Sequence, residues 1–117
     1  MNDIANIYID TWNASTAERR DELLRTSWAT DATYTDPLAH ADGIDGISAV
    51  IGAVREQFPD FVFSVVGAPD AHHEHTRFQW GLGPAEEEPI IIGFDVVTTE
   101  GDGRICSVVG FLDRVPS

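Results

Sequence analysis

Cysteine and basic side chains are scarce in this sequence, and each shortage excludes something. Cys106 is the one cysteine among 117 residues, so no disulfide can form within the chain, which suits a reducing compartment. Only 7 basic residues stand against 20 acidic ones, and the formal net charge is −13. Because such a field repels phosphate and anionic lipid, we expect neither nucleic acid nor a membrane surface as a partner.

Long apolar runs are also missing from the sequence. None approaches the length of a membrane span, and the N-terminus has no basic start followed by apolar residues, so no signal peptide is expected. We therefore predict a cytoplasmic protein. The hydrophobic content of 43% is nevertheless typical of a folded chain, and 117 residues suit one domain that spans residues 1–117.

The spacing of apolar residues predicts three helices in the first half of the chain. One covers about residues 3–13, and another covers about residues 45–58, where Pro59 stops it. Between them, Ser15–Glu18 has the pattern of a capping box, with the serine oxygen as the cap, for a helix that ends near Ala29.

The second half of the chain has the alternating pattern of strands. A short strand over residues 32–36 comes first, and four longer ones follow Pro59, at about residues 61–66, 71–82, 90–100 and 104–115. This order predicts an α+β fold, in which the helices cover the concave face of a curved, mostly antiparallel sheet. The conical pocket left between the two layers is the expected ligand site.

Several short motifs resemble, in their order and spacing, the SnoaL-like branch of the NTF2-like superfamily. They are Trp12-Asn13, the segment 28–32 that leads into Tyr34-Thr35-Asp36-Pro37, and the closing residues 102–105. The resemblance covers nearly the whole chain. It implies a conical barrel with three N-terminal helices, a small hydrophobic ligand, and a homodimer formed through the outer face of the sheet.

Three residues also resemble the catalytic set of the ketosteroid isomerases. Asp36 matches the base, Tyr8, five positions before Asn13, matches the oxyanion-hole tyrosine, and Asp95 matches the oxyanion-hole aspartic acid. The resemblance implies that a proton is removed next to a carbonyl group and that the enolate oxygen is stabilised by hydrogen-bond donors, without a cofactor or metal.

The local sequence suits these roles. Pro37 has no backbone N–H and favours an extended Asp36, so we expect this carboxylate to point in one direction and to be free of strong partners. Asp95 interrupts an apolar strand between Phe94 and Val96. Burial there would raise its pKa and keep it protonated, so that it could donate a hydrogen bond.

Each of these residues also has a plain structural interpretation. Asp36 can belong to a simple turn, Tyr8 can be a core aromatic residue, and Asp95 can face solvent or a subunit interface. The histidines in segment 72–75 resemble metal ligands, but no further ligand is placed by the sequence, so no metal is predicted.

The sequence therefore favours a cofactor-independent isomerase that acts on a small hydrophobic carbonyl compound. A SnoaL-type polyketide cyclase, with an ionised Asp95 as the base, and a non-catalytic small-molecule-binding protein remain open as alternatives. The candidate substrate-binding residues are Trp12, Trp28, His40 and Phe58. Of these, His40 could equally lie on the surface.

Overall fold

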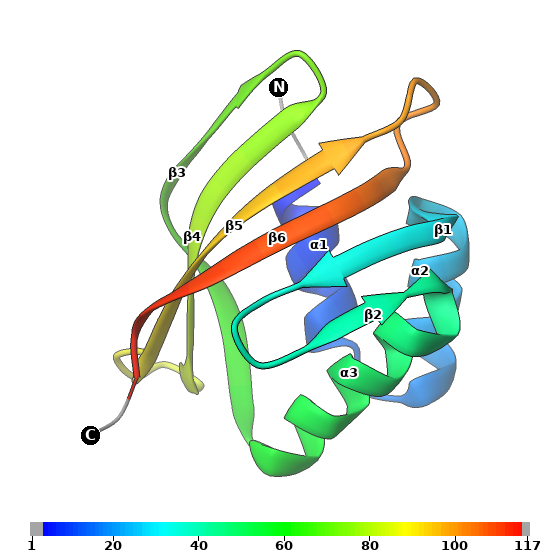
Figure 1. The fold of residues 1–117 in the computed structure, drawn as a ribbon. Helices are drawn as coiled ribbons and strands as arrows, with labels where there is room; N and C mark the ends of the chain where they lie inside the picture. The colour runs from blue at the N-terminus through cyan, green and yellow to red at the C-terminus, as the bar shows by residue number, and fades with distance from the viewer. Residues whose placement is uncertain (1–3, 116–117) are drawn as a thin grey trace.

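Three helices pack on one face of a six-stranded sheet in the computed structural model, which describes residues 4–115 (Figure 1). The helices are α1 (Ile4–Asn13), α2 (Ala17–Ser27) and α3 (Gly43–Gln57). The strands are β1 (Trp28–Thr35), β2 (His40–Asp42), β3 (Phe61–His72), β4 (His75–Pro84), β5 (Ile91–Thr99) and β6 (Ile105–Arg114). This arrangement confirms the predicted α+β class.

The sheet has the strand order β2-β1-β6-β5-β4-β3. β1 and β6 are parallel, and every other neighbouring pair is antiparallel, which confirms the predicted, mostly antiparallel sheet. In Figure 1 the long strands β3 to β6 curve around α1, while α2 and α3 lie against β1 and β2.

An aromatic core joins α1 to the sheet. The Tyr8 ring stacks on Trp28, with ring centroids 5.7 Å apart, and its edge meets Phe78 at 5.5 Å. Trp28 and Phe78 are both buried, and the Trp28 indole N–H donates to the Thr11 hydroxyl at 3.2 Å. These contacts fix the rotation of α1, and hence the side chains that it presents to the sheet.

Several predicted boundaries are wrong by a few residues. Thr16, not Ser15, caps α2, because its hydroxyl accepts the Arg19 N–H at 3.1 Å. That helix ends at Ser27, and β1 begins at once with Trp28. The expected loop before α3 contains the short strand β2, and α3 begins at Gly43 rather than at Asp45.

The turn between β3 and β4 lies further along the chain than predicted. Residues 67–70 form no turn; Gly67, with φ of 71°, lies where the pairing of β3 with β4 shifts register. The strand continues to His72, and His73 takes the positive φ of 53° at the turn itself. Residues 67–69 stand opposite Phe78 alone, and this irregularity accommodates the glycine, because extra residues can be left unpaired without ending a strand.

Gly93 on β5 makes room for the Trp80 ring on β4. A Cβ atom at this glycine would lie 2.1 Å from one ring carbon of Trp80 and 2.3 Å from another. We predict that Gly93→Ala lowers the free energy of unfolding by about 1–3 kcal/mol, because the indole must be displaced. Denaturant unfolding measures this loss, and Gly101→Ala, which meets no atom within 4 Å, is the matched control. Equal stability of the two variants would contradict the prediction.

No helix among residues 4–115 combines the length and the apolar character needed to cross a membrane.

Candidate active site

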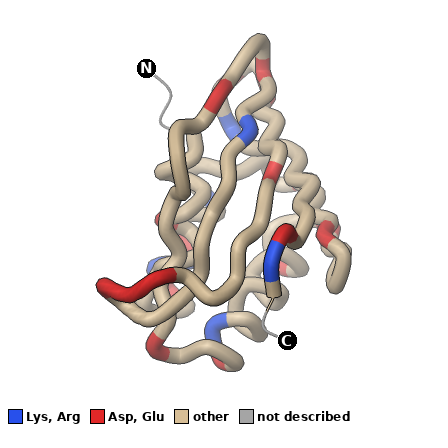
Figure 2. Tube along the Cα trace, turned by 90° about the vertical axis from the view of Figure 1, so that its left-hand side faces the viewer, with Lys and Arg blue, Asp and Glu red and all other residues tan. Residues whose placement is uncertain are grey.

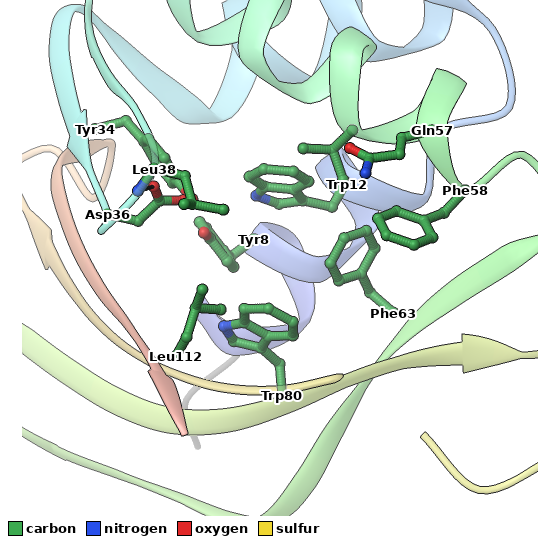
Figure 3. Close-up of a pocket in the computed structure, with 11 residues that line it drawn as sticks. Tyr8, Trp12, Tyr34, Asp36, Leu38, Gln57, Phe58, Phe63, Trp80 and Leu112 are labelled. Carbon is green, nitrogen blue, oxygen red and sulfur yellow. Dashed lines mark hydrogen bonds between the residues drawn. The ribbon is translucent and has the colours of Figure 1, made fainter. Parts of the chain in front are cut away.

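An apolar cavity of about 170 Å³ lies between the concave face of the sheet and helices α1 and α3 (Figure 3). Aromatic side chains make up most of its wall. The lining residues are Tyr8, Trp12, Tyr34, Asp36, Leu38, Val54, Gln57, Phe58, Phe63, Trp80 and Leu112. A concave, mostly apolar site with a few polar groups is typical of a small-molecule site.

Polar atoms gather at one side of this cavity. In Figure 3 the Tyr8 hydroxyl and the indole nitrogens of Trp12 and Trp80 point toward the side where Tyr34, Asp36 and Leu112 lie. The opposite side is formed mainly by Phe58 and Phe63. The cavity thus has a polar end and an apolar end.

Asp36 is held by three hydrogen-bond donors at the polar end. Its Oδ1 accepts the backbone N–H groups of Leu38 and Ala39, each at 2.8 Å, and its Oδ2 accepts the Tyr34 hydroxyl at 2.5 Å. The prediction of a carboxylate free of strong partners is therefore wrong, because the turn after Pro37 folds back onto the side chain. A carboxylate has about four lone-pair sites, so one remains for a further proton.

Asp95 lies in the concave face of the sheet, directly beside Asp36. It is 2% exposed and is paired across the sheet with Gly110 of β6. A Cβ atom at Gly110 would lie 2.5 Å from Asp95 Oδ1 and 3.5 Å from Asp36 Cβ. The absence of a side chain at residue 110 thus leaves room for the Asp95 carboxyl group close to the Cβ atom of Asp36, although Asp95 itself lies behind the cavity wall rather than in it.

Burial raises the pKa of Asp95 from its ordinary value of 3.8 to about 6. Polar hydrogens of Tyr8 and Trp80 oppose this rise, and the charge of Asp36 adds to it. The Trp80 N–H is near enough to act on Asp95, yet it makes no hydrogen bond. Asp95 therefore changes its charge close to neutral pH, which is unusual for an aspartate and is typical of functional carboxyl groups.

The two tyrosines of the site stay neutral. Burial raises the pKa of Tyr8 well above its ordinary value, and the charge of Asp95 adds to the rise. Burial also raises the pKa of Tyr34, as do its hydrogen bond to Asp36 and the charge of that carboxylate. Both hydroxyl groups are consequently proton donors in hydrogen bonds at the pH values at which proteins work.

The other predicted residues divide into two groups. Trp12 and Phe58 line the cavity. Trp28 does not, because it is fully buried behind Tyr8. His40 does not either, because it is exposed on β2, where its ring nitrogens meet Thr35 Oγ1 at 2.7 Å and Asp42 Oδ1 at 3.2 Å. These two corrections follow from packing that periodicity alone does not fix.

Tyr34 and Trp80 are cavity residues that the sequence reasoning missed. A signal for Tyr34 was present, because residues two apart in a strand point to the same face, and Asp36 follows it by two positions. For Trp80 the sequence showed only that it alternates with Arg77 and Gln79. Which of the two sets faces the helices depends on the register of β4.

The histidines of segment 72–75 surround the exposed turn between β3 and β4. The Nδ1 atoms of His72 and His73 lie 3.2 Å apart. Within residues 4–115, no group of three or more His, Cys, Asp or Glu side chains is arranged to hold a metal ion.

The curved sheet, the three helices and the cavity between them define a protein with the NTF2-like fold. A model of the SnoaL-like domain matches residues 6–108, and the chain belongs to this family. The predicted family resemblance is thereby confirmed. Comparison with curated proteins gives no significant match.

Solved structures agree with this assignment. A candidate isomerase of the SnoaL-like family from Agrobacterium tumefaciens is 43% identical, with 94% of each chain covered and a TM-score of 0.89. A candidate polyketide cyclase from Sinorhizobium meliloti is 19% identical over 94% of each chain, with a TM-score of 0.73. An NTF2-like protein of unknown function from Exiguobacterium is also 19% identical, over 93% of this chain and 97% of that one, with a TM-score of 0.73. The last two similarities concern the fold alone.

Proposed function

We propose that this protein is a cofactor-independent isomerase that moves a proton, through an enolate, on a small hydrophobic carbonyl compound. The observation that carries the proposal is that Tyr8 and Asp36 line the polar end of one apolar cavity, with Asp95 directly behind them. These residues come from α1, the end of β1 and β5, and no structural need brings two carboxyl groups together in an apolar core.

Asp36 is the base in this proposal. It lines the cavity, and three donors hold its carboxylate in one orientation, so little reorganisation is needed when a C–H bond is presented to it. The proposed reaction takes its proton from a C–H group that is acidified by a neighbouring carbonyl.

Tyr8 is the donor to the developing enolate oxygen, and Asp95 supports it from behind. The Tyr8 hydroxyl is neutral and lines the cavity, while protonated Asp95 adds no negative charge near the enolate. A ligand that fills the cavity also excludes water, and this raises the pKa of Asp95 further and favours the protonated form.

The sequence excludes one alternative route to the same chemistry. It contains no lysine, so no lysine side chain can form a Schiff base with a carbonyl substrate. In the proposed reaction, enolisation relies on general acid–base catalysis and on hydrogen bonds to the oxygen. The similarity to a candidate isomerase at 43% identity favours this direction, although that description concerns the relative.

A polyketide cyclase of the SnoaL type is the second candidate. A pKa of about 6 leaves much of Asp95 ionised at neutral pH, and an ionised Asp95 could accept a proton through Tyr8. The two reactions share the enolate and differ in its fate. An isomerase returns the proton to another carbon, whereas a cyclase lets the enolate attack a second carbonyl group.

Exchange of the protons next to a ketone tests the proposal without knowledge of the natural substrate. In deuterated buffer, the protein is expected to accelerate deuterium uptake at the α-carbon of a small cyclic ketone, followed by NMR. A β,γ-unsaturated analogue is expected to become conjugated, with a rise in ultraviolet absorbance. If neither reaction exceeds its rate in buffer alone, the protein is a binding module and the proposal fails.

We also propose a homodimer formed through the outer face of the sheet. Val109 is 43% exposed and Phe111 is 54% exposed on β6, and the half-buried Phe94 and Val96 lie beside them on β5. Figure 2 views this side of the sheet, where charged positions are few along the strands and an acidic loop lies at the margin. Exposed apolar patches of this kind favour association.

Phe111→Glu is expected to convert the dimer to a monomer, because the new carboxylate would be buried against its own symmetry mate. Sedimentation velocity measures the change. Leu38→Glu is the control, since Leu38 is 83% exposed at the mouth of the cavity, away from this face. A wild-type monomer at high concentration would contradict the proposal.

A further inference from the structure

We propose that the cavity takes a neutral ketone of one or two rings, whose oxygen lies between the Tyr8 hydroxyl and the Trp12 indole N–H. The inference deepens the proposed function and rests on it for the reaction. The claims about size, charge and the second donor rest on the cavity itself. They can therefore be tested by binding alone.

The volume of the cavity limits the size of the ligand. Pockets that enclose drug-sized molecules, such as a four-ring steroid, measure about 300–1,000 Å³. The cavity here measures about 170 Å³. Phe58, Phe63 and the exposed Gln57 bound its other end (Figure 3), so a longer ligand whose oxygen reached Tyr8 would extend past these side chains into solvent.

The charges at the polar end of the cavity disfavour an anionic ligand there. The Arg55 guanidinium lies 5.8 Å from the Phe63 ring centroid, at the apolar end. Among the described residues that line it there is no arginine or histidine, whereas Asp36 lies in the wall and Asp95 lies directly behind it. The net charge of the chain is −13. A ligand carboxylate would be desolvated beside like charges, which is strongly unfavourable, so a neutral ligand fits this site.

Trp12 supplies a donor that the protein does not use. The residue is 5% exposed, and its Nε1–H has no hydrogen-bond partner, although it lies near enough to the Tyr8 hydroxyl to oppose the rise in the pKa of that group. By contrast, the N–H of Trp28 in the same core is paired with Thr11. A buried N–H without a partner destabilises the folded state, so such a group in a cavity wall is suited to a ligand acceptor.

The Trp12 ring is fixed, so that its N–H has one direction. Its centroid lies 6.3 Å from that of Tyr8, 5.8 Å from Tyr34 and 5.1 Å from Phe63. Figure 3 shows its nitrogen and the Tyr8 oxygen facing the same end of the cavity. A carbonyl oxygen has two lone pairs and can accept from both donors at once, while the rings of the ligand lie against the apolar end.

Isothermal calorimetry with three probes tests this proposal. The probes are 1-tetralone, tetralin, which has the same shape without the oxygen, and androst-5-ene-3,17-dione. The wild type is expected to bind 1-tetralone at least about tenfold more tightly than the steroid. Trp12→Phe keeps an aromatic ring but removes the N–H. It is expected to weaken the affinity for 1-tetralone about tenfold and to change the affinity for tetralin by less than about twofold.

The outcomes separate binding from catalysis. Three results would each overturn the inference. They are an affinity for the steroid equal to or above that for 1-tetralone, no binding of 1-tetralone, and an equal loss of affinity for 1-tetralone and tetralin in Trp12→Phe. Deuterium uptake by 1-tetralone is measured separately. Selective binding without catalysed uptake supports the inference and contradicts the proposed function, whereas turnover of the steroid alone does the reverse.

Discussion

Asp36→Asn is expected to lower the catalysed rate of α-proton exchange by about 10²–10⁴-fold, the usual contribution of a general base. The amide cannot accept the proton, yet its oxygen can still accept the N–H groups of Leu38 and Ala39 that the carboxylate Oδ1 accepts. The turn after β1 is therefore expected to persist. NMR exchange rates and a thermal unfolding curve measure the two effects on the same sample.

Asp10→Asn is the matched control for this substitution, because Asp10 is exposed on α1 and faces away from the cavity. It is expected to leave exchange unchanged. Full activity in Asp36→Asn would remove Asp36 from the mechanism and direct attention to Asp95. Loss of activity together with loss of the folded state would instead assign Asp36 a structural role.

Asp95→Asn is expected to stabilise the protein while impairing the reaction. The carboxyl group has a pKa of about 6 in the folded state, against 3.8 ordinarily, so the folded state holds its proton more tightly than the unfolded state. Stability from this group is present below pH 4 and is lost as the pH rises through 6. The difference corresponds to about 3 kcal/mol, at 1.36 kcal/mol for each pKa unit.

The gain in stability from Asp95→Asn should therefore depend on pH. It is expected to be small near pH 4, and to approach about 3 kcal/mol at about pH 8, where the wild type has an ionised carboxylate in its core. Chemical denaturation of both proteins across this range gives the difference directly. A gain that does not vary with pH would mean that Asp95 titrates normally.

The pH dependence of catalysis separates the two candidate reactions. If protonated Asp95 supports the enolate, the rate is expected to fall as the pH rises past about 6. If ionised Asp95 acts as the base, the rate is expected to rise over the same interval. A profile that Asp95→Asn leaves unchanged would show that Asp95 has neither role.

The sequence predicts the fold well because its strongest signals are local. The helical spacing of residues 4–12, the stop at Pro59 and the alternation of the later strands each depend on neighbours along the chain. The turn between β3 and β4 was misplaced because Gly67 can serve either a turn or a bulge. Which one it serves is decided by strand pairing.

The candidate site was only partly accessible from the sequence. The inward orientation of Asp95 follows from alternation once β5 is placed, and the resemblance picked out Tyr8 and Asp36. The donors on Asp36 could not be predicted, since they depend on how residues 37–39 fold back. The position of Trp28 likewise depends on how α1 packs. Trp12 and Trp28 are both buried, but of the two only Trp12 lines the cavity.

Gly110 has no side chain that would separate Asp95 from Asp36. The charge of Asp36 therefore acts on Asp95 and helps to raise its pKa. In the proposed reaction Asp36 becomes neutral when it takes the proton from carbon. Asp95 then loses that repulsion and turns into a stronger acid at the moment when negative charge appears on the substrate oxygen. Because residue 110 is a glycine, Asp95 would become a stronger hydrogen-bond donor in the same step in which Asp36 takes the proton and the enolate forms.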